Sequence, residues 1–135
     1  MGDLVGYVHI GTGYKHTRIF YKEYMVHILI WIMHNDIVPK GYFVEHKDRI
    51  RLNNKIDNLR LATRSQNCAN VTKRKGNFSS QYKGVSYDTK KEKWLAHIQK
   101  DKKQYFIGLF NSEEDAREAY MIKSIELFGE FAHYD

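Results

Sequence analysis

Residues 45–67 read EHKDRIRLNNKIDNLRLATRSQN, and this stretch decides how the N-terminal half of the chain folds. The spacing Thr63-x-x-Gln66 is that of a capping box, so a helix is predicted to begin at Arg64. The preceding residues 47–58 are polar and irregular, which is typical of a loop. A strand is expected to enter this loop from residues 42–44.

The same stretch carries a carboxylate, an imidazole and an amide, at Glu45, His46 and Asn67. Magnesium prefers oxygen ligands and needs only one or two from the protein when phosphates supply others. An imidazole titrates close to neutral pH and can accept a proton from water. The three groups therefore favour the hypothesis of metal-assisted phosphodiester cleavage. Adjacent strand residues point to opposite faces, so Glu45 and His46 share a site only where the strand ends or bulges.

The flanking residues 5–10 and 17–24 are rich in β-branched and aromatic residues, which predicts a β-hairpin. The apolar residues 26–34 suit either a buried helix or a buried strand. His27 lies on that apolar segment, and we expect it to be a hydrogen-bonded core histidine. Pro39-Lys40-Gly41 then predicts a turn.

Composition limits the class of protein. The 135 residues include 22 Lys+Arg against 16 Asp+Glu, giving a net charge of +6 and favouring a polyanionic partner. A single cysteine, Cys68, excludes a disulfide within the chain and a Cys-rich zinc site, and favours a reducing compartment. The longest apolar run is far shorter than the roughly 20 residues of a membrane span. A soluble, cytoplasmic protein without a targeting segment is expected, with no membrane partner and no small-molecule cofactor.

The C-terminal half differs from the N-terminal half in composition and in its predicted elements. Residues 71–81 are basic and then rich in Gly, Asn and Ser, which predicts a linker between domains at 1–70 and 82–135. Three strands are expected after it, at residues 82–87, 93–99 and 104–110. A helix should begin after Ser112, where acidic residues suit the helix dipole, and end at Gly129.

Period-2 alternation and helical spacing predict how this sheet and helix pack. Trp94, Ala96 and Ile98 should face the helix, and Lys93, Leu95, His97 and Gln99 should face outward. On the helix, one largely apolar stripe should cover the sheet, formed by Ala116, Ala119, Tyr120, Lys123 and Leu127. The expected fold class is α+β throughout, with a small three-stranded antiparallel sheet packed on one helix in the C-terminal part.

Residues 42–70, YFVEHKDRIRLNNKIDNLRLATRSQNCAN, resemble the core of phage and intron-encoded HNH homing endonucleases. The matches are at His46, Asn53-Asn54, Asn58-Leu59, Thr63 and Asn67. The resemblance implies a ββα-metal fold, with His46 as general base and Asn58 orienting it or bracing its loop. Position 45 and Asn67 would ligate one Mg²⁺ or Mn²⁺ per site. The family usually has Asp where this chain has Glu45.

Residues 79–135 resemble the plant Apetala/ethylene-response-factor DNA-binding domain, through YKGV, KWLAHI, IGLF, SEEDAREAY and LFGEFA. In that family a three-stranded sheet enters the major groove. By resemblance the contact positions are Lys83, Ser86, Asp88, His97, Gln99, Gln104 and Phe106. None of these is Arg, which implies weaker readout of guanine, whereas lysines such as Lys93 suit the DNA backbone.

The basic residues Arg64, Lys73, Arg74 and Lys75 are expected to follow DNA phosphates. Together these features predict a site-specific endonuclease that binds double-stranded DNA, most simply as a monomer that nicks one strand. The alternative is a DNA-binding protein without catalysis, in which Glu45 has disabled the metal site.

Overall fold

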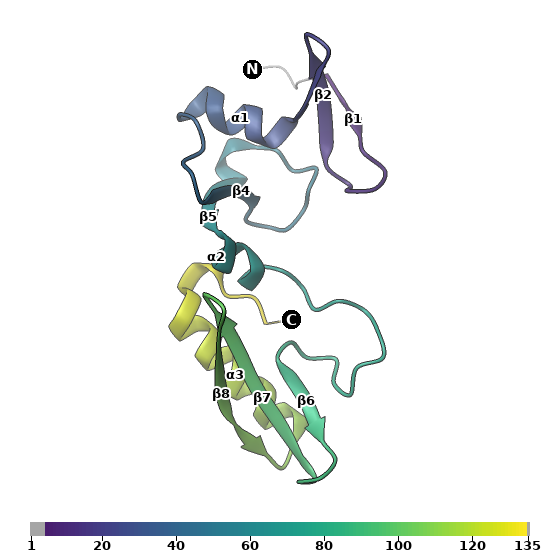
Figure 1. Cartoon of the computed structure of the whole chain (residues 1–135), viewed down its shortest axis with the longest axis vertical. Helices are drawn as coiled ribbons and strands as arrows, with labels where there is room; N and C mark the ends of the chain where they lie inside the picture. Colours follow the sequence, from purple (N-terminus) through teal and green to yellow (C-terminus); the bar gives the residue numbers. More distant parts are fainter. Residues whose placement is uncertain (1–4, 135) are drawn as a thin grey trace. The chain divides into compact units, whose positions relative to one another are not determined.

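The computed structural model describes residues 5–134. The first four residues and the last one fall outside it, and with them the outer ends of the two expected domain ranges. The described chain mixes helices with three small antiparallel sheets (Figure 1), which confirms the α+β class. It divides into two compact units between Arg64 and Ser65. None of its helices is both long and apolar enough to cross a membrane.

The first sheet has the order β1-β2-β3, with β1 at Tyr7–Val8, β2 at Lys15–Ile19 and β3 at Lys22–Met25. The expected single strand at residues 17–24 is wrong, because the chain reverses within it at Phe20 and Tyr21. Both residues have positive φ, 47° and 66°. Two aromatic residues in that conformation are uncommon, and their strand-forming composition concealed the turn.

Residues 26–34 form the helix α1 (Val26–His34), which resolves the alternative between helix and strand. Its first residues, Val26 and His27, are buried. At its end, the Asn35 backbone N–H donates to the Trp31 carbonyl at 2.9 Å. The helix has nine mostly apolar residues, and only its first two are fully buried. A short apolar helix can therefore pack one turn against its neighbours without being enclosed on all sides.

Strands β4 (Tyr42–His46) and β5 (Leu59–Thr63) pair antiparallel, with Glu45 opposite Arg60 and His46 opposite Leu59. The loop between them contains a 3-10 turn, η1 (Ile56–Asn58). Helix α2 (Arg64–Ala69) begins at the predicted residue. The strand before the loop, the loop and the helix start are as predicted, whereas no strand had been predicted at residues 59–63.

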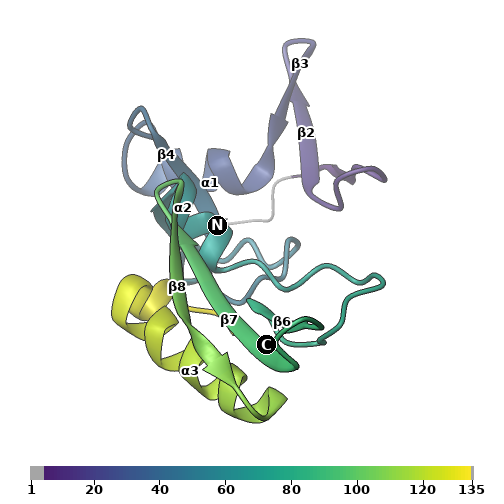
Figure 2. The same ribbon diagram turned by 60° about the horizontal axis from the view of Figure 1, so that its bottom comes forward.

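The second unit contains the sheet β6-β7-β8 and helix α3, which packs against it (Figures 1 and 2). The strands are β6 (Val85–Asp88), β7 (Lys93–Lys100) and β8 (Lys103–Phe110), followed by α3 (Glu113–Phe128) and the 3-10 turn η2 (Gly129–Phe131). Ser112 Oγ accepts the Asp115 N–H at 3.1 Å, and Gly129, at φ 54°, ends the helix as predicted.

The core of this unit lies between β7 and α3. Ala96 and Ile98 are buried as predicted, and small residues at Ala96 and Ala116 let helix and sheet approach closely. The most buried helix positions are Ala116, Tyr120, Ser124 and Phe128, spaced by four residues. The buried stripe is therefore rotated slightly from the predicted one, because Ala119, Lys123 and Leu127 lie at its half-buried edge.

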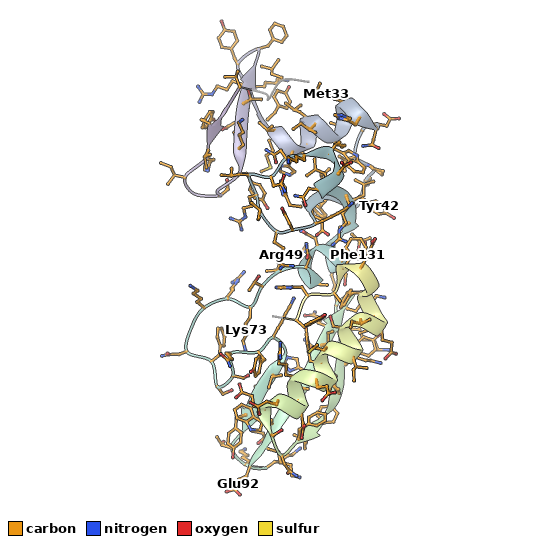
Figure 3. All side chains as sticks on the ribbon, turned by 180° about the vertical axis from the view of Figure 1, so that it is seen from behind. Met33, Tyr42, Arg49, Lys73, Glu92 and Phe131 are labelled. Carbon is orange, nitrogen blue, oxygen red and sulfur yellow. The ribbon has the colours of Figure 1, made fainter. Side chains whose placement is uncertain are left out.

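Residues 71–81, expected to be a linker, are tied to the second unit. Ser80 is buried and its hydroxyl donates to the Glu113 carboxylate at 2.6 Å. The ammonium of Lys73, labelled in Figure 3, donates to the carbonyls of Ser80 and Tyr82 at 2.7 and 2.8 Å. The division between the two units falls after Arg64, the first residue of α2, so residues 71–81 belong to the second unit.

Candidate active site

Glu45 is a buried carboxylate of the first unit. Its side chain projects to the same face as Arg60, because the two residues are paired across β4 and β5. Arg60 Nε donates to Glu45 Oε1 at 2.6 Å, and both side chains are nearly buried, 5% exposed for Glu45 and 12% for Arg60. The second carboxylate oxygen, Oε2, is buried without a hydrogen-bond partner among the described residues. A buried oxygen of this kind is suited to a hard cation.

His46 lies next in sequence, at the last residue of β4. The pairing of β4 with β5 is regular through His46, so no bulge turns the two side chains to one face. Of the two features that could let these side chains share a site, a strand end is present at His46 and a bulge is absent from the β4–β5 pairing. Beyond His46, the chain leaves the strand, with Lys47 N–H donating to the Asn58 carbonyl at 2.8 Å.

The imidazole of His46 is buried and held by a side chain that the sequence had not assigned a role. Its Nε2 lies 2.8 Å from Asn54 Oδ1. Because an amide oxygen only accepts, Nε2 carries the proton in this arrangement and Nδ1 is the basic nitrogen. The pair Asn53-Asn54 was a visible part of the motif, but its spacing alone did not show which amide reaches the ring.

Two rings pack against His46. The His27 ring lies 4.9 Å from it and the Tyr14 ring 5.9 Å, centroid to centroid. Burial, together with nearby His46 and His16, lowers the pKa of His27 to about 4, so this ring is neutral near pH 7. His27 is a core histidine as expected, but its Nδ1 has no hydrogen-bond partner within residues 5–134.

Asn58 was expected either to orient the imidazole or to brace its loop, and its hydrogen bonds are those of a loop brace. The amide nitrogen donates to Asp48 Oδ1 at 2.8 Å and to the Asn53 carbonyl at 2.9 Å. Its oxygen accepts the Asp48 N–H at 3.1 Å. Burial opposes ionisation of Asp48, but hydrogen bonds from Asn53, Ile50 and Asn58 outweigh it and lower the pKa of this carboxyl.

Asn67, the second expected metal ligand, lies half-buried on α2, in the unit that begins at Ser65. Arg64 precedes it and is exposed. Within residues 5–134, no group of three or more His, Cys, Asp and Glu side chains could hold a metal ion. Magnesium needs only one or two protein ligands when phosphates supply the others, and Asn67 as a ligand stays a prediction.

In the second unit, the expected DNA-contacting residues occupy the face of the sheet away from α3. His97 pairs with Phe106 and Gln99 with Gln104, across β7 and β8. These four side chains are exposed, Phe106 by 67%. Half-buried positions on β6 and β7 complete the same face at Ser86, Asp88 and Lys93.

The expected basic contacts divide into two groups. The ammonium of Lys83 donates to the carbonyls of Ala69 and Val71 at 2.8 and 2.6 Å, after the end of α2, and Lys73 is held by carbonyls of its own loop. Both lysines therefore have an intramolecular role that composition did not indicate. Arg74 and Lys75 are exposed and remain the basic residues of this loop that are presented to solvent.

Comparison with known proteins places this geometry in context. Residues 24–69 match the family described as HNH endonuclease, and this range includes α1, β4, β5 and α2. Over 120 residues the chain is 34% identical to Protein 3.8 of Escherichia phage T7, and the match covers 89% of this chain and 98% of that protein.

A second relative is the uncharacterized HNH endonuclease L560 of Acanthamoeba polyphaga mimivirus, 37% identical over 95 residues. The match covers 70% of this chain, which spans about half of the mimiviral protein, 48%. No solved structure matches the chain significantly.

Proposed function

We propose that this chain, whose residues 24–69 match the HNH endonuclease family, is a site-specific DNA endonuclease that hydrolyses one phosphodiester bond per site. One observation carries the proposal. A buried imidazole, oriented by the Asn54 amide, follows directly on a carboxylate whose Oε2 has no hydrogen-bond partner among the described residues. A structural histidine and a structural ion pair would not need that combination.

His46 is the proposed general base. With Nε2 protonated towards Asn54, Nδ1 takes the proton from the water that attacks phosphorus. The Asn54 amide fixes the tautomer, and the neutral His27 ring packs against the imidazole. Asn58 acts indirectly, because it holds the loop that begins after His46.

Glu45 and Asn67 are the proposed ligands of one Mg²⁺ or Mn²⁺ ion. Glu45 Oε2, which has no hydrogen-bond partner within residues 5–134, fits this role, and an amide oxygen at position 67 is a ligand of the same hard type. The bound ion would offset negative charge on the phosphate and on the departing 3′ oxygen. Arg60, by holding Oε1, keeps the longer Glu side chain in a single orientation.

The second unit is the proposed DNA-positioning part. Its outer face presents amides, an imidazole and Phe106, which suit base edges and the sugar-phosphate backbone of a duplex. The resemblance to the Apetala/ethylene-response-factor domain supports this orientation of the sheet. The exposed Arg64, Arg74 and Lys75 would add phosphate contacts. A monomer with one such centre would nick one strand.

The test is cleavage of supercoiled plasmid DNA in the presence of Mg²⁺, with and without EDTA. Wild-type protein should convert the supercoiled form to open circles that carry 5′-phosphate and 3′-hydroxyl ends. His46→Ala should lower the rate by about 10²–10⁴-fold while DNA binding in a gel shift is retained. The matched control is His34→Ala, an exposed histidine at the end of α1, which should cleave like wild type.

Two results would contradict the proposal. Binding without cleavage by wild-type and His46→Ala proteins alike would show a DNA-binding protein in which Glu45 and Arg60 no longer support catalysis. Equal cleavage by both proteins would show that His46 is not the base.

A further inference from the structure

The turn between β2 and β3 contains residues that its backbone does not favour. Ile19 pairs with Lys22, which leaves Phe20 and Tyr21 as the two residues of the turn, both with positive φ. Tight hairpin turns of this kind favour Asn, Asp and Gly, because a side chain beyond Cβ destabilises the left-handed conformation. Folding alone would therefore select small or polar residues here.

The two aromatic side chains do not contribute to a core. Phe20 is 92% exposed and Tyr21 103%, and the five residues from Arg18 to Lys22 are all exposed. Two views show the turn at the outer end of the hairpin, pointing away from α1 (Figures 1 and 2). An exposed pair of aromatic residues on a backbone that disfavours them indicates a contact with another molecule.

The charges around the turn indicate which kind of molecule. Arg18 and Lys22 flank the aromatic pair, one on each strand. Glu23 pairs with Arg18 across the strands, accepts a hydrogen bond from the Tyr7 hydroxyl and lies 3.2 Å from His16 Nδ1. The tip thus combines two cations with two aromatic rings and carries no acidic residue of its own.

We propose that the Phe20-Tyr21 turn is a wedge that inserts between neighbouring base pairs of duplex DNA, while Arg18 and Lys22 contact the adjacent phosphates. Apolar side chains that enter a base step unstack it and kink the duplex, and flanking cations stabilise the phosphates that the kink brings near. The inference rests on the proposed function, because it takes duplex DNA as the molecule that the protein binds.

The experiment replaces the turn with residues that its backbone prefers. In a His46→Ala background, which prevents cleavage, Phe20→Asn is combined with Tyr21→Gly. The probe is a short DNA duplex of mixed sequence that contains 2-aminopurine at several steps, since unstacking raises its fluorescence. The double variant should fold with an unchanged or higher midpoint of thermal unfolding. It should also bind the probe about tenfold more weakly and lose the fluorescence increase.

Two matched proteins separate a wedge from other effects. Exchange of the rings, Phe20→Tyr with Tyr21→Phe, keeps two aromatic residues and should bind and unstack the probe like the parent. Ile122→Ala removes an exposed apolar side chain on α3 and should change neither readout.

Unchanged binding and fluorescence in the Asn-Gly variant would overturn the wedge. So would a lower thermal midpoint in that variant, which would show that the rings serve the fold, or a change in its oligomeric state, which would show contact with a second copy. These measurements need no catalysis, so the proposed endonuclease activity and the wedge can fail independently.

Discussion

The β4–β5 pair and the β6–β7–β8 sheet use polar residues in opposite ways. In the first, the polar residues of interest are buried and fixed by partners, Glu45 by Arg60 and His46 by Asn54. In the second, His97, Gln99, Gln104 and Phe106 are exposed on one face. The difference fits the two proposed tasks, because proton transfer needs a group held in one orientation, whereas reading DNA needs side chains that can reach the grooves.

The two regions should also differ in the interactions that stabilise them. A buried charge is stable only with its partner, so the β4–β5 pair depends on a few specific contacts. The three-stranded sheet is stabilised by apolar packing on α3, which leaves its outer face free to vary. Substitutions should therefore destabilise the first region through its polar groups and the second through its core.

The largest effect is expected from Arg60→Met. It leaves the Glu45 carboxylate buried without its cation and should lower the free energy of unfolding by about 3–5 kcal/mol. The measurement is urea unfolding followed by circular dichroism. A second change, Glu45→Gln, should recover much of the loss, because it removes the unpaired charge. As a control, Lys123→Met breaks an exposed ion pair with Glu126 and should change stability by less than about 1 kcal/mol.

Gly84→Ala tests the packing of the other region. At φ 71° the residue is in the left-handed conformation, and a Cβ there would overlap the Tyr120 ring. We expect a loss of about 2–3 kcal/mol in the second unit, measured by hydrogen exchange of amides in β7 and α3. Gly41→Ala also has positive φ but meets no atom within 4 Å, so it should lose less. Equal losses would show that backbone strain, not the Tyr120 contact, dominates.

The pH dependence of stability should come in part from His27. Burial lowers its pKa in the folded chain to about 4 from the ordinary value of 6.5, so the unfolded chain binds the proton more tightly. The stabilising effect is complete above pH 6.5 and is lost as pH falls towards 4. Between about pH 7.5 and pH 5 the loss should be about 2 kcal/mol. His27→Phe should remove this part of the pH dependence, and an unchanged profile would assign it to other groups.

The smallest effect is expected on the exposed face. Gln99→Ala or Gln104→Ala should weaken binding to the preferred duplex by about tenfold, because an amide pairs with one base edge. The thermal midpoint should not change, since both side chains are exposed. Binding is measured by fluorescence anisotropy with competing mixed-sequence DNA. An equal loss for all sequences would show that these amides contact the backbone and do not read bases.

Much of the fold follows from local patterns. The helix start at Arg64, the three strands of the second sheet, the Ser112 cap and the Gly129 end depend on neighbouring residues, and all were predicted within a few positions. Two features were missed because their local composition did not indicate the structure that forms. The turn at Phe20-Tyr21 has no turn residues, and the loop of residues 71–81 has the composition of a linker but is held by Lys73 and Ser80.

The sequence by itself determined which candidate catalytic groups this protein carries. The types and spacing of Glu45, His46, Asn58 and Asn67 are set by the local sequence, and the basic composition favours a polyanionic partner. Only the tertiary structure decided which groups meet: Arg60 with Glu45, Asn54 with His46, and the rings of Phe20 and Tyr21 with solvent. The physical reason is that residue type fixes charge and hydrogen-bonding capacity, whereas strand register and burial fix the partner that satisfies them.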